Sequence, residues 1–513
     1  MKFLRQWLIV VSVVFAAGCS TNPVTGKNEL SLISESQELN IGKQQYAPMR
    51  QSQGGDYEVD PKVAAYVNEV GQRLVAVSDR KLPYEFKVLN NSVPNAWALP
   101  GGKIAINRGL LIELNSEAEL AAVLGHEIIH AAAKHGAQGM QRGMLLQGLV
   151  VAASIATQGK SYANAAELGS SLGAQLVNQK YGRDAELESD EYGMKYMSRA
   201  GYDPQGAVDL QKTFVKLSES KQQNWLSGLF SSHPPSPERV QNNIRIAKSL
   251  PKGGRVGREK YQQMIARLKK NKSAYDNYDK AQKALAKGRT DEAKRLTRKA
   301  ISLEPREGHF HSLLGDIEQK NKNYKTALNQ YDKAVSLNSN FFYYYLQRGL
   351  AKSELRRSTS AKGDLQKSVK LLPTANAYKV LGDIASNERQ YAEAKQYYAK
   401  AAGNDSATGK AAYSSLVKLD LGDNPGKYIS VRTGVDRSGR LIAEISNPTT
   451  LPVTDIEITV QYPDASNRMR QASQSLQGNL AAGEKSTVRL NVSVNPANAQ
   501  KVRSVVSRAR VIN

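Results

Sequence analysis

The sequence predicts a multidomain protein with three folds in succession: a mostly helical α+β domain, an α-solenoid of short repeats and a C-terminal antiparallel β-sandwich. Three observations indicate this order. An alanine- and leucine-rich helix follows strand-like segments in the first half, a 34-residue step recurs within residues 274–410, and apolar and polar residues alternate across residues 425–513. At 513 residues the chain is also too long for a single hydrophobic core.

The first twenty residues have the pattern of an exported protein. A basic start (Lys2, Arg5) precedes an apolar run that is too short to span a bilayer, and small residues then lead directly to Cys19. This arrangement resembles a bacterial lipobox, at which residues 1–18 are removed as a signal peptide and Cys19 is acylated. Ser20 then favours delivery to the outer membrane. We expect a Gram-negative outer-membrane lipoprotein that faces the periplasm; the alternative is a plain signal peptide with an incidental thiol.

The charge of the chain is strongly basic, with 71 Lys and Arg residues against 47 Asp and Glu residues and a formal charge of +24. Such a field suits anionic partners, including acidic lipid surfaces and acidic proteins, or it is a solvated surface that aids solubility. No nucleic-acid motif accompanies it, so nucleic acid is not an expected partner. Residues 251–300 hold 16 basic and 5 acidic residues. We therefore expect a basic linker at 251–273, after a first domain at 19–250.

The first domain combines helices with a small amount of strand. Ser116 followed by Glu119 has the pattern of a capping box and predicts a helix from Ser116 to Lys134. The apolar segment 145–157 is too short for a membrane span and is expected to be a buried helix or a lid over a cleft. The other expected elements are a short helix within residues 20–55, a helix from Pro61 to Val77 and a hairpin that turns on Gly101 and Gly102.

Residues 274–410 contain an internal repeat of about four units. Gly315 and Gly349 are 34 residues apart, as are Ala293, Ala327 and Ala361. Small residues at this step let two antiparallel helices approach closely, and 34 residues is the period of tetratricopeptide repeats. The concave side of such a solenoid commonly binds peptide or protein, so a protein partner is expected here. The aromatic run 341–345 is either core packing between repeats or, in part, an exposed binding patch.

The chemistry is carried by His126-Glu127-Ile128-Ile129-His130, which lies inside the predicted helix. Residues four apart lie on one helix face, so both imidazoles can bind one metal ion, as in HExxH zinc sites. Glu127 can act as general base toward a metal-bound water and then pass the proton to the leaving amine. The pattern predicts a hydrolase with one zinc ion per chain.

The remaining histidines of the helical segments have other roles. His135 is close to His130 in sequence but about half a turn around the helix, so it is expected to be structural and not to bind the same metal. His309 and His311 lie in the repeats and carry no metal signal.

A catalytic zinc site needs a third protein ligand, and the segment RDAELESDEYG follows about sixty residues later. In this segment Glu186 and Asp190 share a helix face. Here the chain resembles metallopeptidase family forty-eight, the group of HtpX-like, Ste24-like and BepA-like enzymes, in which HExxH is followed by ExxxD. The resemblance implies a zincin-type fold, Glu186 as the third zinc ligand and Asp190 as the carboxylate that orients a zinc-bound histidine. The alternative for Glu186 is a solvated acid, with Glu188 and Glu191 nearby.

Two flanking segments extend the resemblance. NAWALPGG, residues 95–102, is similar to the family's substrate-side segment, where an exposed edge strand would bind an extended peptide, or it is simply a structural hairpin. SHPPSPERV, residues 232–240, resembles the segment that ends the family's catalytic domain. His233 could occupy the open coordination position and keep the enzyme latent, as is proposed for BepA-like members. Alternatively His233 or Arg239 stabilises the tetrahedral oxyanion, or both are structural.

The resemblance covers roughly residues 20–250, and BepA-like members also pair such a domain with tetratricopeptide repeats. It implies a periplasmic zinc endopeptidase that cleaves misfolded or stalled envelope proteins gripped by the repeats. The basic bridge and the terminal β-sandwich depart from that plan. Two other hypotheses are a latent peptidase that acts mainly as a lipoprotein chaperone or scaffold for outer-membrane protein assembly, and a cell-wall enzyme that acts on peptidoglycan.

Overall fold

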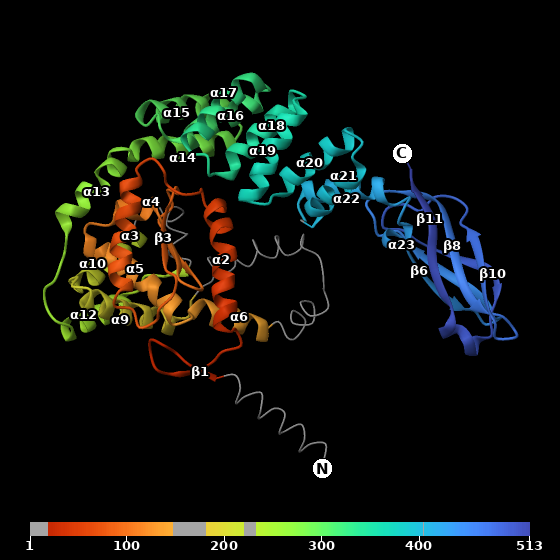
Figure 1. Ribbon diagram of the computed structural model, residues 1–513, viewed down its shortest axis with the longest axis horizontal. Helices are drawn as coiled ribbons and strands as arrows, with labels where there is room; N and C mark the ends of the chain where they lie inside the picture. Colours follow the sequence, from red (N-terminus) through yellow and green to blue (C-terminus); the bar gives the residue numbers. More distant parts are fainter. Residues whose placement is uncertain (1–18, 147–180, 220–231, 404, 513) are drawn as a thin grey trace, which may run out of the picture. The chain divides into compact units, whose positions relative to one another are not determined.

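The computed structural model describes residues 19–146, 181–219, 232–403 and 405–512 (Figure 1). These residues belong to two compact units, one that ends at Leu372 and one that begins at Pro373. The expected lid or buried helix at 145–157 lies almost wholly outside the described residues. Within them, no helix is both long enough and apolar enough to cross a membrane.

A three-stranded sheet lies next to helix α5 in the first unit, in the order β3-β5-β4. Strand β3 (Glu85–Leu89) is parallel to β5 (Lys103–Asn107), and β4 (Ala96–Leu99) is antiparallel to β5. The turn between β4 and β5 passes through Gly101 and Gly102, whose φ angles of +75° and +79° lie in the region that favours glycine. The expected hairpin is therefore confirmed, and β3 joins it on the other side of β5.

Helix α5 (Glu117–Ala132) lies in the core of the first unit, and all of its residues are buried. The Ser116 hydroxyl accepts a hydrogen bond from the Glu119 backbone N–H at 3.2 Å and so caps its N-terminus. The helix ends earlier than expected, because Lys134 has a left-handed φ of +62° and α6 (His135–Leu146) then starts anew. Because the whole helix is buried, its side chains are held in place by the packing around them.

Helix α9 (Arg183–Arg199) packs against α5 at a glycine contact. A Cβ atom on Gly125 would lie 3.2 Å from the Gly193 carbonyl oxygen, and one on Gly193 would lie 3.1 Å from the His126 backbone nitrogen. Close approach of the two helices therefore depends on these two glycines. The other helices and strands up to residue 249 are β1 (Cys19–Thr21), β2 (Asn28–Leu30), α2 (Glu35–Ser52), α3 (Pro61–Val75), α4 (Arg108–Glu113), α10 (Gln205–Glu219) and α12 (Pro237–Ser249).

The basic segment 251–273 differs from the expected linker. Most of it forms helix α13 (Arg258–Lys270), whose Tyr261, Ile265 and Leu268 are at most 1 % exposed and belong to the same apolar core as α3 and α5. The Tyr261 hydroxyl donates to the Leu111 carbonyl at 2.6 Å. The segment is therefore part of the first unit's core, and its basic residues cover the outer face of a packed helix.

Residues 272–402 form four antiparallel helix pairs, three in the first unit and one in the second. A Cβ atom on Gly315 would lie 2.5 Å from the Tyr331 ring, and one on Gly382 would lie 2.5 Å from the Tyr398 ring. The recurring small residues are thus required where the two helices of a pair meet. The pairs are α14 (Lys272–Ala286) with α15 (Thr290–Leu303), α16 (Gly308–Lys320) with α17 (Tyr324–Leu337), α18 (Phe342–Glu354) with α19 (Ser358–Leu371), and α20 (Ala375–Asn387) with α21 (Tyr391–Ala402).

The second unit continues with two three-stranded antiparallel sheets, in the orders β10-β7-β6 and β11-β8-β9. Alternate residues of β7 and β8 are buried, and one apolar cluster includes Leu441, Ile458 and Val506. Strand β9 is mostly polar, and β11 contains three arginines. The elements are α22 (Ala407–Asp420), α23 (Pro425–Tyr428), β6 (Ser430–Val435), β7 (Arg440–Ser446), β8 (Val453–Pro463), β9 (Met469–Ser475), β10 (Lys485–Ser493), η1 (Pro496–Lys501) and β11 (Arg503–Val511).

Truncation of a buried α13 side chain tests whether this helix belongs to the core. Ile265→Ala should reduce the free energy of unfolding by about 2–5 kcal/mol, because it removes buried methylenes and leaves a cavity. Gln263→Ala, on the exposed face of the same helix, should change it by no more than about 0.5 kcal/mol. The measurement is urea unfolding followed by tryptophan fluorescence. Equal small effects of both substitutions would show that α13 is a loosely attached connector.

Candidate active site

Helix α5 presents two imidazoles to one point. His126 and His130 are one helical turn apart, and their Nε2 atoms lie 3.0 Å from each other. Both side chains are deeply buried. Burial lowers the pKa of His130 well below its usual value, which keeps this imidazole neutral and able to offer a lone pair.

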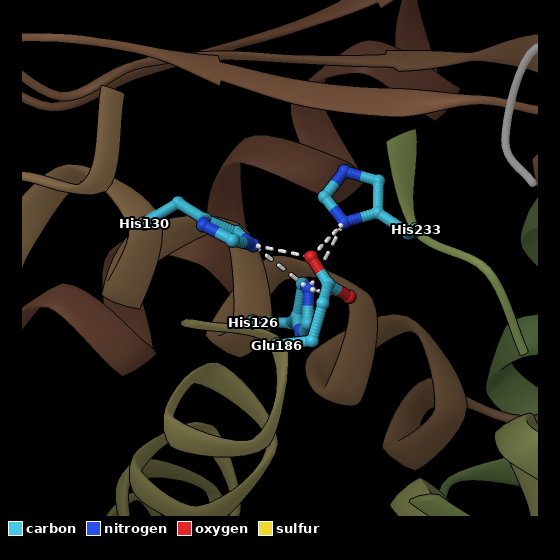
Figure 2. Close-up of side chains that lie close together, drawn as sticks. All are labelled: His126, His130, Glu186 and His233. Atoms are coloured by element: carbon cyan, nitrogen blue, oxygen red, sulfur yellow. Dashed lines mark hydrogen bonds and ion pairs between the residues drawn. The ribbon is translucent and has the colours of Figure 1, made fainter. Parts of the chain in front are cut away.

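Glu186 reaches the same point from α9 (Figure 2). Its Oε1 lies 3.5 Å from His130 Nε2, and its Oε2 lies 3.5 Å from His126 Nε2. Burial acts to raise the pKa of this carboxyl group, but the His233 and His126 side chains lower it well below its usual range. Glu188 and Glu191 instead face His135 and Lys195. The geometry thus selects Glu186 among the three neighbouring acids.

The segment just before α12 carries His233, which completes a cluster of four side chains (Figure 2). Its Nδ1 lies 2.9 Å from Glu186 Oε1 and 3.3 Å from His126 Nε2. One donor atom from each of His126, His130, Glu186 and His233 lies within 4.8 Å of the others. His309 and His311 belong to no such group in the described part of the chain.

The spacing of these donor atoms fits a tetrahedral metal ion. Ligands about 2.1 Å from such an ion are separated from one another by about 3.4 Å. The contacts between these residues run from 2.9 to 3.5 Å, and one donor atom from each lies within 4.8 Å of the others. Two imidazoles and a carboxylate are also the donor set of many catalytic metal sites. The four residues therefore fit a divalent metal ion.

Asp190 and Arg239 brace this cluster from behind. Asp190 Oδ1 accepts from His126 Nδ1 at 2.9 Å, and Arg239 forms two 2.7 Å bonds to the Asp190 carboxylate. Arg239 Nη1 also lies 2.8 Å from Glu186 Oε2. Burial would raise the pKa of Asp190, but the Arg239 charge holds it below the usual value. The Arg239 guanidinium is thus engaged by two buried carboxylates.

Glu127 lies beside the cluster without joining it. Its Oε1 is 3.6 Å from His233 Nε2, and its buried Oε2 has no hydrogen-bond partner among the described residues. Burial raises the pKa of this carboxyl group. A raised pKa and an unpartnered oxygen are the properties of a side chain that exchanges a proton.

Two contacts of His130 were missed by sequence reasoning. His135 was expected on the same helix as His130, but it begins the next helix, α6. Its Nδ1 lies 3.0 Å from His130 Nδ1. Its Nε2 is 3.2 Å from Glu188 Oε1. The Tyr181 ring stacks on His130 with ring centroids 3.9 Å apart. Proximity in sequence was the only indication that His135 could contact His130, and no feature of the sequence indicated the contact of Tyr181.

Strand β4 lies at the edge of its sheet, in the order β3-β5-β4, and all four of its residues are buried. Trp97 packs edge-to-face on Tyr46 of α2, with ring centroids 6.0 Å apart, and its indole N–H donates to Gln53 Oε1 at 3.1 Å. The α2 helix therefore covers part of this strand.

The comparisons agree with this fold and site. The sequence profile of peptidase family M48 matches residues 61–245, and that of the tetratricopeptide repeat matches residues 309–341 and 375–408. The chain belongs to peptidase family M48 and is a metallopeptidase with C-terminal helical repeats. Among its relatives, the beta-barrel assembly-enhancing protease of Escherichia coli (strain K12) is 26% identical over 362 residues, which are 64% of this chain and 73% of the relative.

Two further relatives match a smaller share of the chain. Metalloprotease LoiP of Escherichia coli (strain K12) is 31% identical over 193 residues, 36% of this chain and 74% of LoiP. Metalloprotease YcaL of the same strain is 30% identical over 187 residues, 35% of this chain and 71% of YcaL. The common part holds the His-Glu cluster, so the family match and the geometry point to the same residues.

The brace on His126 makes a measurable prediction. Asp190→Asn should weaken divalent-metal affinity by about 10- to 100-fold, because the imidazole loses the carboxylate that orients it and raises its basicity. Asp184→Asn, an exposed aspartate on the first turn of the same helix, is the matched control and should leave the affinity unchanged. Competition against a chelator of known affinity measures both. Equal affinities for the two variants would contradict the assigned role of Asp190.

Proposed function

We propose that this chain is a zinc-dependent endopeptidase of the Gram-negative cell envelope, which hydrolyses peptide bonds of misfolded or stalled envelope proteins. The observation that carries the proposal is the convergence of His126, His130 and Glu186 on one point, with Glu127 beside it. Two imidazoles and one carboxylate are the ligand set of catalytic zinc sites of the HExxH type. When bound there, zinc would polarise the scissile carbonyl and make the attacking water more acidic.

Glu127 is the proposed general base. Its unpartnered Oε2 can accept the proton of the attacking water, and its raised pKa lets the protonated form then donate to the leaving amine. Asp190 holds His126 in the tautomer whose Nδ1 carries the proton, which leaves Nε2 as a ligand atom. Arg239 is proposed as a positioning residue, because it fixes both Asp190 and Glu186.

His233 is the proposed latency switch. Its Nδ1 stands among the ligand atoms and its Nε2 lies 3.6 Å from Glu127, so it fills the corner that water and substrate need. Proteolysis would then require the segment that carries His233 to move aside. The alternative of oxyanion stabilisation by Arg239 is not favoured by its two carboxylate partners.

The cellular setting rests on the export signal, the repeats and the relatives. We propose that Cys19 is acylated, that the protein faces the periplasm at the outer membrane, and that the repeats at 274–410 bind client proteins. A relative that shares both the peptidase part and the repeats is named for beta-barrel assembly. We also propose that the first domain is of the zincin type and that the two sheets at 425–513 form a β-sandwich that serves as a spacer or docking module.

Replacement of the proposed base should separate chemistry from metal binding. Glu127→Gln should reduce cleavage of an unfolded protein substrate such as casein by at least about 10²- to 10⁴-fold while metal content stays unchanged, because the amide cannot accept the proton. Glu191→Gln, exposed and paired with Lys195, is the control and should remain active. If purified Glu127→Gln protein cleaves casein at the wild-type rate, this proposal is wrong.

Removal of the His233 side chain should have the opposite effect. His233→Ala should raise the rate of casein cleavage, by about 10-fold if the closed form makes up about nine-tenths of the molecules. Metal content should persist, since three ligands remain. A loss of activity with metal retained would instead assign His233 to transition-state stabilisation.

A further inference from the structure

A second cavity of the first unit lies apart from the metal cluster. Its volume is about 660 Å³, within the range of pockets that hold a sizeable ligand. The end of α2 and the segment 90–93 after β3 line one side. The first helices of three repeats, α14, α16 and α18, line the other side. None of its lining residues belongs to the metal cluster.

One wall of this cavity is aromatic. Phe341, Phe342 and Tyr343 line it from the third repeat, and Tyr278 lines it from the first. Phe341 is buried and packs on His309 with ring centroids 4.8 Å apart, while Phe342 and Tyr343 are only partly buried. The aromatic run is therefore core packing at Phe341 and cavity surface at the next two residues. Such a wall can cover the alkyl stem of a long side chain.

The acidic end of the cavity is Asp316 on α16. Its carboxylate accepts hydrogen bonds from the Tyr331 hydroxyl at 2.8 Å and the Tyr343 hydroxyl at 3.1 Å. Neutral hydroxyls are the only hydrogen-bond donors to it in the described part of the chain, and no lysine or arginine forms an ion pair with it there. Burial raises the pKa of this carboxyl group to about 7. Asp316 is partly buried, and a carboxylate held there without a cation is unfavourable, so it is expected to serve a ligand.

An unpartnered hydroxyl points to the same ligand position. Ser312 lies one helical turn before Asp316 on α16 and lines the cavity. It is 2 % exposed, and its Oγ has no hydrogen-bond partner among the described residues. The Arg108 guanidinium at the opposite side is engaged, because it stacks on Tyr275 and donates to Asn90. Asp279 and Lys283 of α14 also line the cavity, and the acceptors at its Asp316 end are that carboxylate and the Ser312 hydroxyl.

We propose that this cavity binds a lysine or arginine side chain of an extended client segment, with the aromatic wall against its stem and Asp316 and Ser312 at its cation. This inference rests on the proposed function and names the recognition feature of its substrates. Val93 of the cavity is three residues before Ala96, which lines the small apolar space beside His126 and Glu127. Three residues span about 10 Å at most, so the two spaces are lined by neighbouring parts of one short chain segment.

The test is binding of a matched pair of peptides to the full chain, metal-loaded and carrying Glu127→Gln so that no peptide is cut. Each peptide has about 12 residues, enough to span roughly 40 Å when extended. The two are end-blocked, uncharged and identical except for one central lysine or norleucine. Fluorescence anisotropy gives the affinities. We expect the lysine peptide to bind at least about 10-fold more tightly, because the cation forms a charge-assisted bond in a buried site.

The isosteric substitution Asp316→Asn should remove this preference, so that both peptides bind with the affinity of the norleucine peptide. Asp332→Asn on α17, which removes an exposed aspartate, is the control and should keep the preference. The inference would be overturned if the two peptides bound equally to the protein in which Asp316 is intact. It would also be overturned if Asp316→Asn kept the preference for the lysine peptide. Because this experiment measures binding, its outcome does not depend on whether the wild-type chain cleaves casein.

The pH dependence of binding is a second readout. Affinity for the lysine peptide should fall about 10-fold from pH 8 to pH 6, because Asp316 is ionised only above about pH 7. The tyrosines around it have raised pKa values and stay protonated, and the His309 pKa is lowered, so His309 stays neutral over most of this range. Asp316→Asn should abolish the slope, and a slope retained there would contradict the assignment. The titratable and charged groups that line the cavity or contact Asp316 are Tyr278, Asp279 and Lys283 on α14, Arg108 on α4, His309 on α16, Tyr331 on α17, and Tyr343 and Tyr344 on α18.

Discussion

The close contact between α5 and α9 is the constraint on which the site depends. Two ligand imidazoles lie on one helix and the ligand carboxylate on the other, so a small separation of the helices would pull the donor atoms apart. The contact is made by Gly125 and Gly193, where a Cβ atom would lie only 3.1–3.2 Å from the opposite backbone, closer than an ordinary van der Waals contact. Burial of α5 on all sides then prevents it from rotating. The placement of these three side chains is therefore a consequence of helix packing.

The charges behind the ligands follow from the same packing. Once α5 and α9 touch, Glu186 and Asp190 are both buried beside His126, and two carboxylates without a counter-charge would be strongly unfavourable. Arg239 supplies that charge from α12 and contacts both acids. Its segment also carries His233, so the residue that neutralises the two acids and the fourth member of the cluster lie six residues apart. Arg239 also donates to the Pro234 carbonyl at 3.3 Å, which ties α12 to the residue next to His233.

Much of this organisation could be predicted from sequence because its signals are local or periodic. The spacing of His126 and His130 fixes their relation on a helix, and the 34-residue step fixes the repeats. The α13 helix shows how composition can mislead: Tyr261, Ile265 and Leu268 have the spacing of a buried helical stripe, but the surrounding lysines and arginines suggested a linker. The contact of His135 with His130 depends on a left-handed turn at Lys134, which no side-chain pattern announces. The cavity at Asp316 depends on packing between segments more than two hundred residues apart.

The most direct measurement of the central claim is the metal content of the purified protein, wild type beside Glu186→Gln, with Glu191→Gln as the exposed neighbour for comparison. If the two imidazoles and the α9 carboxylate hold one ion, the wild type and Glu191→Gln should retain about one zinc per chain through dialysis and Glu186→Gln should lose most of it. Undiminished zinc in Glu186→Gln would contradict the ligand set and with it the proposed chemistry.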